Sequence, residues 1–331
     1  MTICQLSNLL MRIKPGFRDF CTPLSVVILA LLWLPALSGC TSQGIIETPS
    51  SNQNGRVRYL VIHHTSENFA NSLALLTEPS ENPVSAHYLI PEPGDETYAA
   101  RALKIYRLVP ESRRAWHAGK SYWNGEAALN DRSIGIELVN KTYCIERPAE
   151  DLELTEPDRF CFYPDFAEPQ LTLLFELVAG ILRRHPDIEP TAIVGHADIA
   201  PDRKVDPGPR FPWQRLYRYG FGAWYDEDTV VTYWDRFRTS LPPIDVVQRA
   251  LHEYGYQIEA TGVNDDQTRL VVRAFQMHFR PMLVTGETDA ESAAVLFALL
   301  EKYRPERLEE LLGPPPVAVE PVTSRIYKAN R

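Results

Sequence analysis

The spacing of hydrophobic and polar residues predicts an α/β domain in the first part of the chain. Residues 57–64 (VRYLVIHH) and 133–140 (SIGIELVN) predict strands, and 191–196 (TAIVGH) predicts a third, short one. The apolar residues of EPQLTLLFELVAGILRRHP recur on one face of a helix, and Pro169 suits its first turn. Strands that alternate with helices indicate an α/β domain, which we expect over residues 56–224.

The pattern changes after Pro242 and Pro243. Residues 244–312 contain three helical patterns separated by turns at Gly262 and Gly286, which predicts a small all-α domain. GVNDDQTRLVVRAFQ and GETDAESAAVLFALL both place an Asp-x-x-Ser/Thr cap before an apolar helix. Residues 225–243 predict a linking helix, and residues 313–331 predict a coil tail.

The N-terminus has the pattern of a secretory signal peptide over residues 1–39. Basic residues in MRIKPGFR precede the apolar run PLSVVILALLWLPALSGC, and Met11 is an alternative start to Met1. The run ends in LSGC, which resembles a bacterial lipobox and predicts cleavage before Cys40 and a lipid on that cysteine. A transmembrane anchor is the alternative. In bacterial lipoproteins, Thr41 after the cysteine implies sorting to the outer membrane, where the protein would face the periplasm.

Composition and charge restrict the class of protein. The 331 residues are 44% hydrophobic and 23% charged, as in ordinary globular proteins with about two domains. The net charge of −9 argues against nucleic acid as a partner, because nucleic-acid binders normally show a basic patch. The polar residues 40–55 predict a flexible tether.

Two cysteines remain in the mature chain besides Cys40. An oxidising periplasm would permit a disulfide between Cys144 and Cys161. The bridge needs Cα atoms within about 7 Å of each other, which the sequence does not establish, so both states stay open.

Three residues have the chemistry of a metal site. His63 and His196 each end a predicted strand, and Asp206 follows in the next loop. A catalytic zinc usually takes three protein ligands and keeps a fourth position for water. Each residue alone is more often structural or on the surface. His64 points to the opposite face from His63, so one of this pair is not a ligand.

The ordered motifs VIHHT, SAHYLI, WHAG, NDxSIGIE and HADIAPDRKVDPGP resemble the zinc-dependent N-acetylmuramoyl-L-alanine amidases of the amidase-2 family. The resemblance covers residues 57–216 and implies a mixed central β-sheet flanked by helices. The C-terminal unit resembles a three-helix peptidoglycan-binding domain. The lipobox, FGAWY and AFQMHFRP narrow the resemblance to the outer-membrane lipoproteins of this family.

The resemblance also implies the roles of individual residues. It implies one Zn²⁺ per chain, held by His63, His196 and Asp206. Glu137 would take a proton from the zinc-bound water and pass it to the leaving nitrogen. Lys204 would stabilise the oxyanion, whereas without the family context it reads as a surface lysine.

Five further residues are candidates for substrate contacts. They are His87, Trp116, His117, Asn130 and Arg132. Core packing of an aromatic cluster is the alternative for the first three. In the helical domain, Tyr254-Gly255-Tyr256 and Phe275-Gln276 fit a core role as well as a ligand-contact role, and that domain could be a packing partner rather than a glycan binder.

The expected activity is hydrolysis of the amide between N-acetylmuramic acid, including 1,6-anhydro forms, and L-alanine. The partners would be peptidoglycan and muropeptides, and the membrane through Cys40, with the chain as a monomer. One alternative is a peptidoglycan recognition module without catalysis. Another is a zinc peptidase that cuts within the stem peptide, although an HExxH motif is absent.

Overall fold

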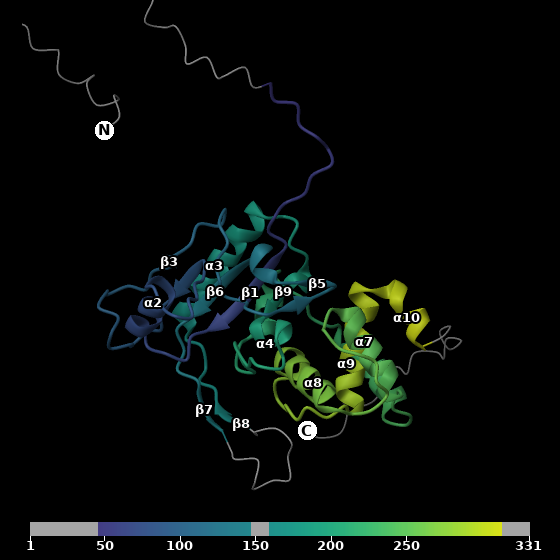
Figure 1. The fold of residues 1–331 in the computed structure, drawn as a ribbon. Helices are drawn as coiled ribbons and strands as arrows, with labels where there is room; N and C mark the ends of the chain where they lie inside the picture. Colours follow the sequence, from purple (N-terminus) through teal and green to yellow (C-terminus); the bar gives the residue numbers. More distant parts are fainter. Residues whose placement is uncertain (1–45, 147–158, 313–331) are drawn as a thin grey trace, which may run out of the picture. The chain divides into compact units, whose positions relative to one another are not determined.

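The computed structural model describes residues 46–146 and 159–312 (Figure 1). The predicted signal peptide, Cys40 and the coil tail lie outside the described residues. Residues 46–53 belong to a separate unit from residue 54 onward, and they are exposed and without helix or strand. Within the described ranges, no helix combines the length and apolar character needed to span a bilayer.

A five-stranded sheet in the order β3-β2-β6-β1-β9 forms the centre of the first domain (Figure 1). Its strands are β1 (Tyr59–His64), β2 (Tyr88–Ile90), β3 (Tyr106–Arg107), β6 (Ser133–Leu138) and β9 (Ile193–Gly195). Strand β3 is antiparallel to β2, and the other pairings are parallel. The predicted mixed sheet is therefore confirmed. All six residues of β1 are buried, because parallel sheets are covered on both faces.

Helices cover both faces of this sheet. Helix α3 (Glu168–Arg184) packs its apolar residues in one cluster with Tyr88 and Ile90 of β2. Helix α2 (Phe69–Thr77) packs in a second cluster with Leu89. Alternate residues of a strand point to opposite faces, so the two helices lie on opposite sides of the sheet. Two short helices, α4 (His196–Ile199) and α5 (Trp213–Arg218), follow β9.

The second domain is helical. It contains α7 (Ile244–Tyr254), α8 (Asp266–Phe279), α9 (Ala290–Tyr303) and α10 (Pro305–Leu312), while α6 (Glu227–Phe237) packs against α9. Both predicted caps are confirmed, since Asp265 accepts from the Thr268 amide and Asp289 from the Ser292 amide. The sequence pattern did not separate α10 from α9. Helix α10 begins at Pro305, and proline is suited to the first turn of a helix.

The two helical turns contain the same polar network. Gln248 accepts from the Gly262 amide and donates to Thr268. Gln276 accepts from the Gly286 amide and donates to Ser292. All four side chains are buried and bonded, so hydrogen bonds from the helices hold both turns in place.

The two domains share one hydrophobic core. The rings of Trp123 and Tyr256 meet edge to face with centroids 4.7 Å apart. Gly255 has φ +143°, and a Cβ there would lie 2.8 Å from the Trp123 ring, so only glycine fits between them. Tyr254, Tyr256, Phe275 and Gln276 are all buried, so the structure gives these residues the core role.

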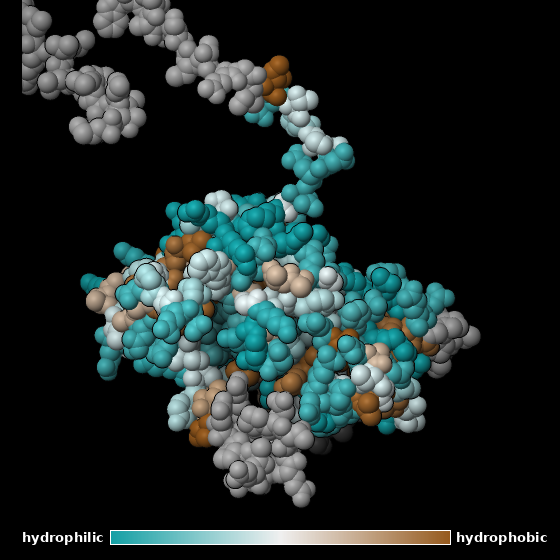
Figure 2. Space-filling view, viewed as in Figure 1, coloured by the Kyte–Doolittle hydropathy of each residue, from teal (hydrophilic) through white to brown (hydrophobic). Residues whose placement is uncertain are grey.

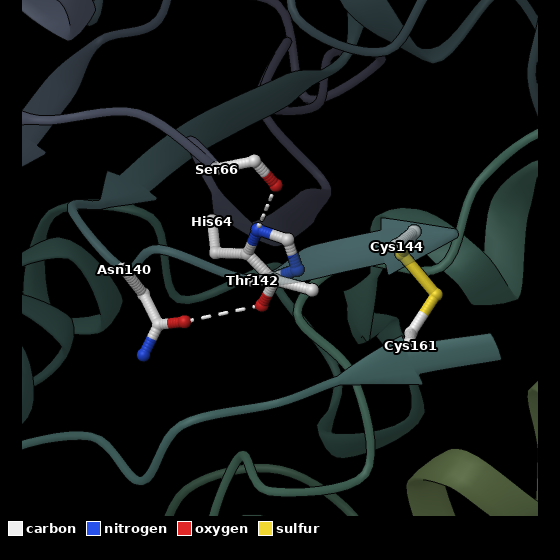
Figure 3. The surroundings of a disulfide bond; sticks show 6 residues. All are labelled: His64, Ser66, Asn140, Thr142, Cys144 and Cys161. Carbon is white, nitrogen blue, oxygen red and sulfur yellow. Dashed lines mark hydrogen bonds between the residues drawn. A yellow bond between two sulfur atoms is a disulfide. The ribbon is translucent and has the colours of Figure 1, made fainter.

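A β-hairpin carries Cys144 and Cys161. Strands β7 (Tyr143–Glu146) and β8 (Arg159–Phe162) are antiparallel, and Cys144 lies directly opposite Cys161. The two are joined in a disulfide with Cα atoms 4.0 Å apart, which answers the question that the sequence left open (Figure 3).

The face drawn in Figure 2 is mostly hydrophilic, with hydrophobic side chains at scattered positions.

Candidate functional site

Strand pairing brings His63 and His196 together. In the parallel pair β1–β9, Ile62 is the register partner of Gly195, so the residue that follows each of them reaches the same edge of the sheet. The sequence had predicted His196 as the last residue of a strand. In the structure it is the first residue of α4. The amide of Ala197 donates to the Asp206 carbonyl at 2.8 Å, which closes the loop and places Asp206 beside both histidines.

The three side chains converge on one point. His63 Nδ1 lies 3.0 Å from His196 Nδ1 and 3.1 Å from Asp206 Oδ2, and His196 Nδ1 lies 3.2 Å from the same oxygen. All three residues are buried. They form the one group within the described ranges that could hold a metal ion.

A series of hydrogen bonds determines which nitrogen of His63 carries the proton. The Ser133 hydroxyl donates to the Leu129 carbonyl at 2.6 Å, so Ser133 Oγ accepts from His117 Nε2 at 3.0 Å. Burial holds the pKa of His117 well below its usual range, so its ring is neutral and Nδ1 accepts from His63 Nε2 at 3.0 Å. Burial, and then the neighbouring His196, lower the pKa of His63 to about 4. His63 Nδ1 therefore keeps a free lone pair.

His196 is oriented in the same way. Its Nε2 donates to the Ala118 carbonyl at 3.3 Å. Nδ1 therefore carries no proton, and its lone pair points at His63 and Asp206. Two lone pairs and a carboxylate oxygen within 3.2 Å repel one another unless a cation lies among them. The residues present therefore fit a metal ion, and two imidazoles with one carboxylate are a donor set that suits zinc.

Glu137 lies beside the metal group on the next strand. It is the register partner of His63 in the parallel pair β1–β6. Its Oε2 is buried and has no hydrogen-bond partner. Burial, and then the charge of Asp206, raise the pKa of this carboxyl to about 8, against the opposing effect of Lys204. A carboxyl that changes protonation near neutral pH is suited to proton transfer.

Lys204 lies in the turn after α4, two residues before Asp206. Its amide donates to the Ala200 carbonyl at 3.0 Å, and its side chain is partly buried. The positive charge of Lys204 lowers the pKa of both His63 and Glu137, so its ammonium is close enough to act on the group electrostatically.

Four of the five candidate substrate residues divide into three kinds. His117 contacts His63, and Asn130 Oδ1 accepts from the amides of His117 and Ala118, so both shape the metal group. His87 is completely buried, and both ring nitrogens bond to the main chain, so it packs in the core. Trp116 is 50% exposed next to His117 and is free to meet a ligand.

Arg132 lies at the opposite end of β6 from the metal group. It precedes β6, whereas Glu137 lies near the other end of that strand, about 16 Å away at the rise of an extended chain. Its guanidinium pairs instead with Glu126 at 3.3 Å. His64, the neighbour of His63, bonds to the Ser66 hydroxyl through Nδ1 at 3.2 Å and takes no part in the metal group (Figure 3).

Two contributors to the site escaped the sequence analysis. Arg203 donates to the carbonyls of Ala118 and Lys120 and so fixes the loop that accepts from His196. Gly135 makes room for the His117 ring, because a Cβ there would lie 2.4 Å from it. Neither residue type signals such a role in one sequence, since each acts only through the packing of distant segments.

Comparison with known proteins shows the family of this chain. The profile of the N-acetylmuramoyl-L-alanine amidase family matches residues 53–209, and that of a peptidoglycan binding domain matches residues 240–296. The chain belongs to the N-acetylmuramoyl-L-alanine amidase family, as its sequence resemblance predicted. It is 40% identical to N-acetylmuramoyl-L-alanine amidase AmiD of Escherichia coli strain K12 over 287 residues, covering 82% of this chain and 97% of that one.

Two solved structures of relatives carry substrate-like peptides. AmpDh3 from Pseudomonas aeruginosa in complex with anhydromuramic pentapeptide is 42% identical with a TM-score of 0.71, covering 80% of this chain and 99% of that one. AmiD from E. coli in complex with anhydro-N-acetylmuramic acid-L-Ala-D-gamma-Glu-L-Lys is 41% identical with a TM-score of 0.65, covering 78% and 93%.

Proposed function

We propose that the chain hydrolyses the amide bond between N-acetylmuramic acid, including its 1,6-anhydro form, and L-alanine in peptidoglycan or its fragments. The convergence of His63, His196 and Asp206 beside Glu137 is the observation that carries this function. The ligands of the two similar structures, both anhydromuramyl peptides, support the substrate class.

His63 Nδ1, His196 Nδ1 and an Asp206 carboxylate oxygen would hold one zinc ion. Bound zinc supplies a Lewis acid that polarises the carbonyl and lowers the pKa of water. Glu137 receives a proton from the attacking water at its unpartnered Oε2 and delivers it to the L-alanine nitrogen. Lys204 places its ammonium where the carbonyl oxygen develops negative charge.

Lys204→Met should lower kcat about a hundredfold or more while leaving KM and zinc content close to wild type. The reason is that the ammonium acts on charge that develops only in the transition state. Steady-state kinetics on a defined muropeptide would measure the effect, with the exposed Lys104→Met as the control. A kcat within about threefold of wild type would remove Lys204 from this role.

Mass spectrometry of products from a defined 1,6-anhydro muropeptide tests the function. An amidase releases anhydro-N-acetylmuramic acid and the intact stem peptide. Fragments cut within the stem would indicate the peptidase instead, and binding without products would indicate the recognition module.

A lipid on Cys40 would hold the enzyme at the outer membrane, facing the periplasm. The LSGC sequence supports this location, and the Cys144–Cys161 disulfide suits an oxidising compartment. Cys40→Ala should prevent labelling with radioactive palmitate in growing cells, whereas Cys144→Ala should not. Continued labelling of the Cys40 variant would contradict lipid attachment at this residue.

A further inference from the structure

Asp198 is a buried carboxylate that the reaction does not use. It lies on α4, two residues after His196, and is only 2% exposed. Its Oδ2 accepts from the main-chain amide of Gly195 at 2.7 Å. The carboxylate is therefore fixed to the residue that immediately precedes His196.

The other two donors to Asp198 come from the helical domain. The Tyr256 hydroxyl donates to Oδ1 at 2.6 Å, and His278 Nδ1 donates to Oδ2 at 2.8 Å. All three side chains are buried. A buried charge is stable only when its hydrogen-bond partners are present, so α4 depends on the second domain for two of the three bonds to this carboxylate.

Tight packing connects this cluster to the metal group. The His278 ring stacks on Trp213 with centroids 3.8 Å apart and planes at 16°. A Cβ at Gly195 would lie 2.7 Å from Pro207 and 3.3 Å from both Asp198 and Trp213. Since Gly195 precedes His196 and Pro207 follows Asp206, a shift of Asp198 moves the main chain beside both residues.

We propose that Tyr256 and His278 are positioning residues, and that the helical domain holds His196 in place for metal binding through Asp198. This inference rests on the proposed metal site, but it does not depend on which bond is cut. It gives the helical domain a role in building the active site, whether or not that domain also binds glycan.

Zinc affinity of the full chain, measured by competition with a chelator of known affinity, tests this role. We expect the zinc dissociation constant to rise about tenfold in Tyr256→Phe and in His278→Leu, as for residues that orient a metal ligand. His278→Asn keeps an N–H donor near the position of Nδ1 and should restore most of the affinity.

Lys302→Met is the matched control. Its ammonium donates to the Tyr217 hydroxyl at 2.9 Å, another contact between the domains that does not involve α4. Wild-type affinity in both Tyr256→Phe and His278→Leu would overturn the inference, as would an equal loss in Lys302→Met. If His278→Leu does not fold, Tyr256→Phe, which lacks a single oxygen atom, decides. A wild-type chain that binds no zinc would instead contradict the proposed function.

Discussion

Glu137→Gln is expected to lower kcat by a factor of about 10²–10⁴ while zinc binding and substrate affinity stay close to wild type. The amide has nearly the same size and shape as the carboxyl but cannot accept the proton of the attacking water. Glu137 Oε2 has no hydrogen-bond partner, and Glu137 is not among the three metal-binding side chains, so the substitution breaks no hydrogen bond at that oxygen.

The measurement is single-turnover release of stem peptide together with zinc content per chain. Glu126→Gln is a suitable control, since Glu126 pairs with Arg132 at the far end of β6. A Glu137→Gln enzyme with near-normal turnover would show that another group moves the proton. Loss of zinc from this variant would show that Glu137 belongs to the ligand set instead.

Asp206→Ala should lose both bound zinc and activity, with turnover reduced by at least about a thousandfold. Asp206 contributes the carboxylate of the group, and the two histidines alone leave a site with fewer ligands than a catalytic zinc usually has. Wild-type protein treated with a chelator should behave in the same way, and added zinc should restore the wild type but not the variant.

Asp202→Ala provides the matched control, because Asp202 is an exposed aspartate in the same loop. It should keep wild-type zinc content and rate. Full activity of Asp206→Ala, or activity of the wild type after complete zinc removal, would contradict the metal mechanism.

The sequence was sufficient to predict the residues that now converge. His63, His196 and Asp206 stand in motifs with family-specific order, and the strand register places His63 beside Glu137. Helix α3 could be predicted from its periodicity because it buries one face. Strands β1 and β6 are buried at almost every residue, as short apolar strands inside a parallel sheet are.

What the sequence could not predict depends on contacts between distant segments. His117 was expected at the substrate groove, yet it contacts His63 because Gly135 leaves space for its ring on β6. Asp198 received no role, since its partners Tyr256 and His278 lie in another domain. Local patterning determines elements, whereas these contacts depend on how the elements pack.

Anomalous diffraction at the zinc edge, from crystals of catalytically active protein, tests the central claim most directly. We predict one zinc ion per chain, bound by His63 Nδ1, His196 Nδ1 and an Asp206 carboxylate oxygen, at about 2.0–2.2 Å from each atom. An active enzyme with its zinc bound elsewhere, or with none, would contradict the account.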